Sequence, residues 1–247
     1  MFFDKLKDAS TSDYVVWIGY DPLEDSCAKM LANSIRKRTN LKNLKIIPII
    51  RDQLLAYDIF RRPIDPNGST QFSLTRFMVP YLMNYSGTGI FLDCDMLITR
   101  DIKEFFDMSD ESYAVQCVKH DYIPKSNAKM GGKPQSIYPR KNWSSSVIYN
   151  CNHPSIKKLS REIVERKSPK FLHRFEWIND NEIGELPIEF NFLVGEYAMT
   201  EKLPYNIHHT LGPPIYKECV NCDYSVFWKS EFKDTFKREF DENIDCI

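Results

Sequence analysis

Short apolar runs alternate with helical patterns in the first part of the chain. Residues 14–20 and 44–50 are rich in β-branched and aromatic side chains, which predicts two buried strands. Between these runs, apolar residues recur at helical spacing and form one core-facing stripe: Ala28, Leu31, Ala32 and Ile35. A strand, a helix and a strand of these lengths predict a βαβ unit, which normally crosses over right-handed into a parallel sheet.

The segment Asp21-Pro22-Leu23-Glu24 predicts where this helix begins. It has the order of a capping box, with Asp21 as the cap, Pro22 at the first helical position and Glu24 reaching back from the third. The helix is therefore predicted to follow the first strand at once.

The same reasoning predicts the elements that follow. These are a helix at 72–83, strands at 89–92, 114–118 and 147–149, and a helix at 154–167. Residues 123–140 are too polar and too often interrupted by glycine and proline for a core element, and loops of this length are usually functional or disordered. The whole pattern predicts an α/β fold.

Aromatic residues recur every four positions near the end of the chain, at Trp228, Phe232, Phe236 and Phe240. This stripe predicts a helix that packs on the rest of the protein. Contact with a membrane or a partner is the alternative, but acidic residues nearly balance the basic ones here. We predict one domain over 1–227 and a helical extension over 228–247.

The balance of charge narrows the function. Thirty-three basic and 34 acidic residues give a net charge of −1, which argues against a nucleic-acid surface. An acidic residue already stands at Asp4, which is not typical of the start of a signal peptide, and no apolar stretch approaches the length of a membrane span. A cytoplasmic protein is therefore expected. Seven cysteines in a chain of 247 residues indicate reduced thiols, and Cys219 and Cys222 are interpreted as an incidental pair.

The acid pair Asp93-Cys94-Asp95 follows the apolar run 89–92. In an extended segment both carboxylates face one side while Cys94 turns away. Two carboxylates about 5 Å apart repel by roughly 3 kcal/mol at an effective dielectric of about 20, and a divalent cation such as Mg²⁺ or Mn²⁺ would offset this cost. Two solvated loop acids are the alternative. In an open α/β sheet ligands gather beyond the carboxyl ends of strands, where Tyr20 and Asp21 are also expected.

The residues around the acid pair carry a family resemblance. Residues 69–82 followed by 90–102 resemble the central block of GT-A glycosyltransferases and are most similar to family 8, the glycogenin and lipopolysaccharide galactosyltransferase group. The resemblance implies a Rossmann-like, mostly parallel sheet flanked by helices, a nucleotide-sugar donor held by Arg76, and a metal held by the Asp-x-Asp motif. Taken alone, Arg76 is more simply a surface or ion-paired arginine.

Two further segments extend the resemblance. Residues 207–213 resemble the family's late His-x-x-Gly segment, which implies His208 as third metal ligand, with His209 as the fallback, and Gly212 beside the diphosphate. An imidazole ligand slightly favours Mn²⁺ over Mg²⁺. Residues 18–21 resemble the first-strand end that holds base and ribose, which implies Tyr20 and Asp21; a core tyrosine and a simple helix cap are the alternatives.

The sugar side departs from the family. Trp143-Ser144-Ser145-Ser146 stands where an Asn-Ala-Gly segment is usual, so the stereochemistry stays open. Substrate contacts are expected from residues that combine donor groups with a flat aromatic: Lys141, Trp143, Ser144, Ser145 and His120. A buried tryptophan with capping serines, and a solvated loop, are the alternatives. An inverting enzyme needs a carboxylate base, for which Asp180 and Glu182 are the candidates, although surface helix acids are the simpler interpretation.

These observations predict a metal-dependent glycosyltransferase that moves a sugar from a nucleotide diphosphate, with UDP as the expected nucleotide, to a hydroxyl of a saccharide, lipid or protein. One alternative is a haloacid-dehalogenase-like phosphatase with Asp93 as nucleophile, which needs a late acidic pair that only Asp241 and Asp245 could supply. A non-catalytic sugar-binding module is the other.

Overall fold

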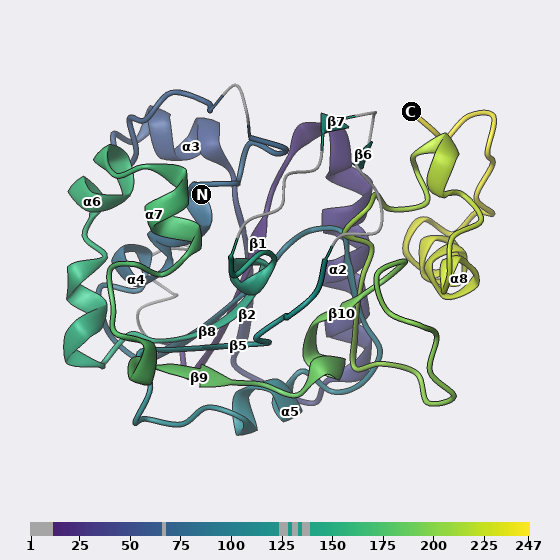
Figure 1. Cartoon of the computed structure of the whole chain (residues 1–247). Coiled ribbons are helices and arrows are strands. Elements are labelled where there is room, and N and C mark those ends of the chain that lie inside the picture. Colours follow the sequence, from purple (N-terminus) through teal and green to yellow (C-terminus); the bar gives the residue numbers. More distant parts are fainter. Residues whose placement is uncertain (1–11, 66–67, 124–127, 130–132, 135–138) are drawn as a thin grey trace.

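A six-stranded sheet forms the centre of the computed structural model, which describes residues 12–65, 68–123, 128–129, 133–134 and 139–247 (Figure 1). The strand order is β2-β1-β3-β8-β5-β9. The strands are β1 (Tyr14–Gly19), β2 (Leu44–Ile49), β3 (Thr88–Leu92), β5 (Val115–Cys117), β8 (Ser146–Asn150) and β9 (Ile183–Glu185). Strand β1 is parallel to β2 and β3, and β5 is parallel to β9, whereas β8 runs antiparallel between β3 and β5. The predicted α/β fold with a mostly parallel sheet is confirmed.

Strand β1 lies at the centre of the core, and its residues from Val15 to Ile18 are at most 1% exposed. Trp17 pairs with Ile47 on one side and Phe91 on the other, which fixes the register of three strands. Helix α2 (Asp25–Arg38) packs on β1, as the βαβ pattern predicts. Burial on both faces explains why these strands are continuously apolar instead of alternating.

A second, three-stranded sheet joins the first through the acid pair. Its order is β10 (Phe192–Leu193), β11 (Asn206–His208) and β4 (Met96–Ile98), with β11 antiparallel to β4. Asp93, Cys94 and Asp95 form the turn between β3 and β4. The expectation of an extended segment was wrong here, because the chain must change direction to pass from one sheet to the other.

The start of α2 differs from the capping box that the sequence predicts. Asp21 is the cap, since its Oδ1 accepts a hydrogen bond from Leu23 N (2.9 Å), but a 3₁₀ turn, Pro22–Glu24, precedes the helix. Glu24 does not reach back to the cap. Its carboxylate is buried and accepts hydrogen bonds from Cys94 and Tyr216, because these interior donors compete successfully with the helix end.

Two predicted helices are broken. The first is divided into a 3₁₀ turn, Thr75–Met78, and the short helix α4 (Val79–Leu82). Pro80 lacks an amide proton, so it cannot make the helical bond back to the turn and is tolerated only at the start of a helix. The second is divided into a 3₁₀ turn, Pro154–Lys158, and α6 (Arg161–Arg166), which begins anew at a serine cap.

The remaining elements are short. They are α3 (Arg51–Ala56), α5 (Lys103–Asp107), α7 (Pro169–His173), 3₁₀ turns at Trp143–Ser145, Asp180–Glu182, Ile188–Asn191 and Lys217–Cys219, and the pair β6 (Ala128–Lys129) and β7 (Lys133–Pro134). The rest of 124–138, and residues 1–5, lie outside the described residues, so the expectations placed on them stay predictions. Among the described helices, none is long and apolar enough to cross a bilayer.

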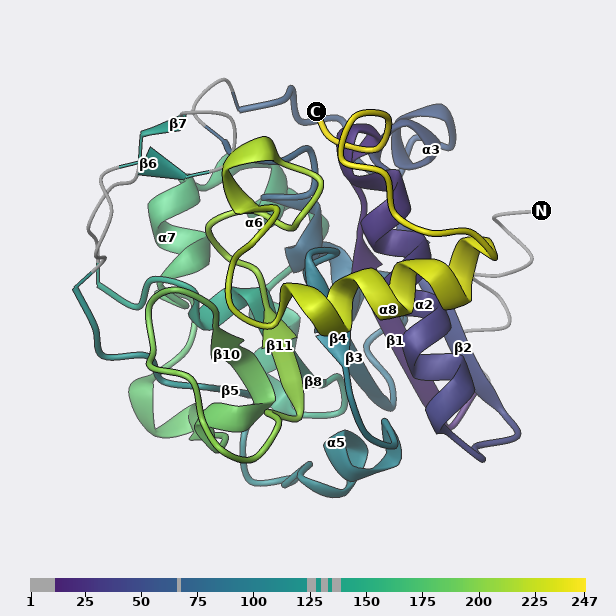
Figure 2. The ribbon, with the colours of Figure 1, turned by 90° about the vertical axis from the view of Figure 1, so that its right-hand side faces the viewer.

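Helix α8 (Ser225–Phe236) packs across α2 (Figure 2). Trp228 and Phe232 are 2% exposed, and the Phe240 ring, which follows the helix, lies 5.2 Å from each of their rings. The aromatic stripe therefore packs on the protein, as predicted. The division of the chain at residue 228 stays a prediction.

Candidate functional site

Asp93, Asp95 and His208 come together at the carboxyl edge of the sheets. One ligand atom of each lies within 4.8 Å of the other two. The β3–β4 turn supplies both carboxylates, and the pairing of Met96 with His208 across β4 and β11 brings the imidazole beside them. The structure thus brings together the three residues that the sequence predicts as metal ligands, although they lie more than a hundred positions apart.

Asn191 determines which nitrogen of His208 faces the acids. The Asn191 amide nitrogen lies 2.9 Å from Ser145 Oγ and 3.3 Å from the Asn142 carbonyl oxygen, and Ser145 Oγ donates its own proton to that carbonyl. The Asn191 amide oxygen is therefore the atom 2.8 Å from His208 Nδ1, and we assign the imidazole proton to Nδ1. The lone pair of Nε2 then faces Asp95 Oδ1, 3.3 Å away.

This contact sets the chemistry of the site. A lone pair and a carboxylate oxygen at 3.3 Å repel unless a proton or a cation lies between them, and Asp95 and His208 are only 5% and 2% exposed. Two carboxylates and an imidazole are ligands that Mn²⁺ accepts. The second nitrogen of the imidazole is held by a buried amide, the arrangement usual for metal-bound histidine. The residues present therefore fit a divalent cation.

Arg76 is buried beside the acid pair. Its Nη1 lies 2.9 Å from Asp93 Oδ1 and donates to the Ser144 carbonyl oxygen at 3.0 Å, and its guanidinium lies 5.2 Å from the Phe72 and Phe91 ring centres. These contacts fit the simpler interpretation of Arg76, which is an ion-paired arginine. A hold on the donor would use the same guanidinium and stays a prediction.

The first strand ends at the same edge. Asp21 accepts hydrogen bonds on both carboxylate oxygens, from Leu23 N and from Gln71 N (each 2.9 Å), so it ties the helix start to the loop before Arg76. Tyr20 donates to Asp25 at 3.1 Å. Both residues have structural partners, and contact with a nucleotide stays a prediction for them.

Gly212 follows the triad in the chain. It has φ = 137°, a conformation that favours glycine, and its amide donates to the His209 carbonyl oxygen at 2.8 Å.

His209 lies next to the triad histidine in the chain, but its Nδ1 is 3.5 Å from Cys222 Sγ, and burial lowers its pKa to about 4. His208 is therefore the histidine of the triad. The described cysteines are all free thiols.

The segment 141–145 positions its neighbours. Trp143 Nε1 donates to the His120 carbonyl oxygen at 2.9 Å, and Ser144 Oγ lies 2.8 Å from His173 Nδ1. Ser145 contacts Asn191, and Lys141 is 7% exposed. The tryptophan is partly buried and the serines are hydrogen-bonded, close to the structural alternative that the sequence leaves open, and the segment contacts His120 and Asn191. Sugar contacts stay a prediction for this segment.

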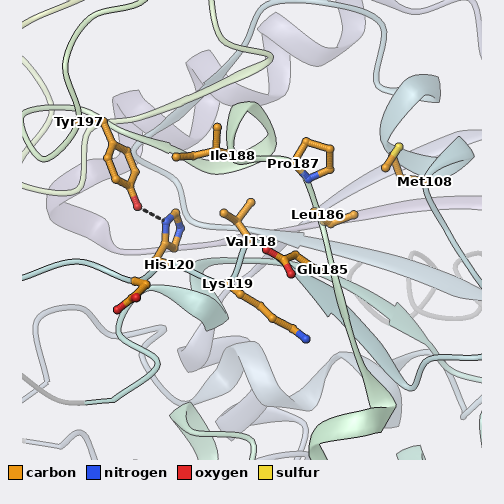
Figure 3. Close-up of a pocket in the computed structure, with 10 residues that line it drawn as sticks. Met108, Val118, Lys119, His120, Glu185, Leu186, Pro187, Ile188 and Tyr197 are labelled. Atoms are coloured by element: carbon orange, nitrogen blue, oxygen red, sulfur yellow. Dashed lines mark hydrogen bonds between the residues drawn. The ribbon is translucent and has the colours of Figure 1, made fainter.

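A pocket with a volume of about 570 Å³ lies beyond the carboxyl ends of β5 and β9 (Figure 3). Its walls combine charged and apolar residues: Met108, Val118, Lys119, His120, Asp121, Glu185, Leu186, Pro187, Ile188 and Tyr197. Figure 3 shows the rings of His120 and Tyr197 on one side, and His120 Nδ1 lies 2.8 Å from the Tyr197 hydroxyl oxygen. A mixed lining of this kind is typical of small-molecule sites.

His120 connects the pocket with the triad. Burial and the neighbouring His208 lower its pKa to about 3, so its imidazole is neutral at pH 7. Within the described part of the chain, its Nε2 has no hydrogen-bond partner although the residue is only 6% exposed. The prediction of a cleft-lining role for His120 therefore agrees with its position.

Asp180 and Glu182 lie elsewhere. They precede β9, and the Glu182 carbonyl oxygen accepts from Ala114 N before β5, whereas the triad lies at the carboxyl ends of the strands. Asp180 pairs with Arg140 at 2.5 Å and is 81% exposed, and Glu182 completes a capping box with Asn179. The structure does not bring these acids to the triad, so a catalytic base at either position stays a prediction without support.

Known proteins can be compared with this site and fold. No protein-family model matches the chain. Protein CDI of Arabidopsis thaliana is 43% identical over 223 residues, which cover 89% of this chain and 86% of that protein. This chain belongs to the family of Protein CDI.

Solved glycosyltransferases share the fold of this CDI-family member. The bifunctional glycosyltransferase WbbM has a TM-score of 0.63 at 16% identity, and the galactosyltransferase LgtC, in complex with donor and acceptor sugar analogues, has 0.56 at 12%. GlyE of Streptococcus pneumoniae has 0.57 at 12%. The match with WbbM covers 95% of this chain and 51% of WbbM, so this chain spans about half of that protein. The match with LgtC covers 89% of this chain and 95% of LgtC, and the match with GlyE covers 95% of this chain and 62% of GlyE. The predicted GT-A fold is confirmed.

Two residues of the CDI-family site were not predicted. Asn191 orients His208, but in the sequence it is simply an amide residue between Phe190 and Phe192. Glu24 was assigned to the helix end, and its contact with Cys94 depends on a turn that joins two sheets. Long-range pairings of this kind leave no periodic signal.

Proposed function

We propose that this protein is a metal-dependent glycosyltransferase that moves a sugar from a nucleotide diphosphate donor to a hydroxyl acceptor. UDP is the expected nucleotide of the donor. The observation that carries the proposal is the 3.3 Å approach of His208 Nε2 to Asp95 Oδ1, with the imidazole proton held on the far side by Asn191. The glycosyltransferase fold supports it.

Asp93, Asp95 and His208 would hold the cation, for which Mn²⁺ is preferred over Mg²⁺ because one ligand is an imidazole. When bound, such a cation stabilises the negative charge that develops on the departing diphosphate. Arg76 keeps Asp93 in place and adds positive charge at the same edge. Asn191 keeps the lone pair of His208 directed at the site.

The nucleotide side of the proposed site is formed by Tyr20, Asp21 and Gly212. Asp21 connects the end of β1 to the loop before Arg76, so a base and ribose bound there would lie beside the acid pair. Gly212 is proposed beside the diphosphate because a residue without a side chain allows a close approach to the backbone. Sugar contacts are proposed for Lys141, Trp143, Ser144 and Ser145, since Trp143 bonds to His120 of the pocket and Ser145 bonds to Asn191 beside the triad.

The acceptor side is assigned to the pocket at His120. A neutral imidazole can accept from or donate to a hydroxyl, and the Tyr197 hydroxyl holds its ring in place. The apolar residues Val118, Leu186 and Ile188 would contact the apolar face of an acceptor. The acceptor class comprises hydroxyl groups of saccharides, lipids and proteins.

The two alternatives receive less support. A phosphatase of the haloacid dehalogenase type needs a late acidic pair beside its nucleophile, but Asp245 is paired with Arg238 at 2.5 Å beside the C-terminal helix α8. A non-catalytic sugar-binding module needs neither the cation nor the oriented imidazole that this edge provides.

A donor panel tests the proposal. Nucleotide sugars are incubated with the protein, with Mn²⁺ or with a chelator, and release of nucleoside diphosphate is measured. We expect release from one class of donor in the presence of Mn²⁺ and its loss in the chelator. Hydrolysis of simple phosphate esters, or the absence of any nucleotide-dependent rise in melting temperature, would contradict the transferase.

A further inference from the structure

Glu24 is a buried acid that the proposed reaction does not use. It is 1% exposed, and both of its carboxylate oxygens accept hydrogen bonds, Oε2 from Cys94 Sγ at 3.0 Å and Oε1 from the Tyr216 hydroxyl at 3.2 Å. Its amide donates to the Asp21 carbonyl oxygen at 3.0 Å. The Glu24 side chain therefore contacts two distant segments, at Cys94 and at Tyr216, while its own 3₁₀ turn starts at Asp21, and each of these three segments contributes to the proposed site.

Each segment carries a different part of that site. Cys94 lies between the two metal-binding aspartates, so the hydrogen bond to Glu24 holds their turn on the side opposite to the carboxylates. Tyr216 follows Gly212 and lies in the segment that leaves His208. The contact with Asp21 reaches the expected nucleotide side. A single residue thus fixes the relative positions of the three segments.

The hydrogen-bond donors around the Glu24 carboxylate are neutral. Cys94 and Tyr216 therefore do not cancel its charge. A thiol and a phenol stabilise a buried carboxylate only in part, whereas a divalent cation at the triad would complete the balance.

We propose that Glu24 is a positioning residue that holds the Asp93-Cys94-Asp95 turn from behind and strengthens cation binding through its negative charge. This role rests on the proposed function, because it requires a cation at the triad. It adds a third acid, beside Asp93 and Asp95, to the electrostatics of the site without adding a ligand. Partners behind metal ligands commonly change metal affinity by about 10 to 100 times when they are removed.

The test compares two buried glutamates by the same substitution. Mn²⁺ affinity in the presence of UDP is measured from the electron paramagnetic resonance signal of free Mn²⁺ for the unaltered protein, Glu24→Gln and Glu231→Gln. We expect the Kd for Mn²⁺ to rise by about tenfold in Glu24→Gln. Glu231 is also 1% exposed but lies between α2 and α8, so Glu231→Gln is expected to leave this Kd unchanged.

Cys94→Ala provides a second variant that keeps the carboxylate and removes one hydrogen bond, for which a roughly threefold rise in Kd is expected. This variant keeps the proposal testable if Glu24→Gln does not fold. Equal Mn²⁺ affinities of the variant and the unaltered protein would overturn the role of Glu24 and leave the metal site standing. Absence of Mn²⁺ binding by the unaltered protein would overturn the cation site and this role together.

Discussion

Glu231 and Glu24 are each 1% exposed, yet the groups around their carboxylates differ in charge. Glu231 lies between α2 and α8, where Lys37 Nζ (2.7 Å) and Arg38 Nη2 (2.9 Å) supply positive charge. Glu24 lies behind Asp93 and Asp95 and receives hydrogen bonds from neutral donors. The charge of Glu231 is neutralised by basic residues of the fold itself. At the sheet edge Arg76 pairs with Asp93, and a cation at the triad would neutralise further negative charge.

The largest expected effect is on the sheet edge. Asp95→Asn removes a ligand and the charge that faces His208, so we expect transferase activity to fall by about 100- to 1000-fold, the range usual for losing one group that stabilises charge in a transition state. Loss of like-charge repulsion should leave the melting temperature of the metal-free protein unchanged or higher. Activity and melting temperature are measured together, and full activity in Asp95→Asn would contradict the comparison.

The next effect concerns the α2–α8 interface. Glu231→Gln leaves Lys37 and Arg38 without their buried partner, and we expect a loss of about 3 kcal/mol in the free energy of unfolding, at the low end of values for broken buried pairs because both cations are partly solvated. Urea denaturation measures this loss. The matched Glu24→Gln should cost much less, because the side-chain donors to this carboxylate among the described residues, Cys94 and Tyr216, are neutral. A larger loss from Glu24→Gln would reverse the comparison.

A third prediction concerns pH and His120. The pKa of His120 is about 3 in the folded protein and about 6.5 in the unfolded chain, so below pH 6.5 the unfolded chain binds the extra proton. The contribution of neutral His120 to the free energy of unfolding is complete above pH 6.5 and decreases as the pH falls toward 3. At pH 5 about 2 kcal/mol of it is lost. In His120→Gln, the difference between the free energies of unfolding at pH 7 and at pH 5 should be about 2 kcal/mol smaller than in the unaltered protein. If His120→Gln had the same pH dependence as the unaltered protein, burial of a neutral His120 imidazole would be contradicted.

The smallest effect separates the pocket from the triad. Tyr197→Phe removes the hydroxyl that lies 2.8 Å from His120 Nδ1. A hydrogen bond of about 1 kcal/mol corresponds to a roughly fivefold rise in KM for the acceptor, with Mn²⁺ affinity unchanged. Acceptor titrations at saturating donor provide the measurement. A change in Mn²⁺ affinity with no change in this KM would assign Tyr197 to the metal side instead.

The strands that carry the site were predictable because burial on both faces leaves continuous apolar runs, as in Val15–Ile18. The acid pair was predictable because it directly follows such a run. His208 was reached only through resemblance to the His-x-x-Gly segment, since a single histidine has no periodic signal. The predicted long helices failed where Pro80 and the cap at Ser160 interrupt them, which shows that apolar spacing does not record local backbone breaks.

The parts that the sequence did not predict are those that depend on contacts between distant segments. Asn191 acts through His208 and Ser145, and Glu24 acts through Cys94 and Tyr216. Local pattern assigned Glu24 to a helix cap, because the capping box is a local motif. The tertiary partners overrode that preference, and the competition could be resolved only with the fold in place.

The most direct test is to locate the cation itself. A crystal grown with Mn²⁺ and UDP, measured near the manganese absorption edge, shows where manganese binds through its anomalous scattering. The account predicts a single strong peak between the carboxylates of Asp93 and Asp95 and Nε2 of His208, with His208 Nδ1 still bonded to Asn191. Manganese bound elsewhere, or an empty triad beside bound UDP, would contradict it.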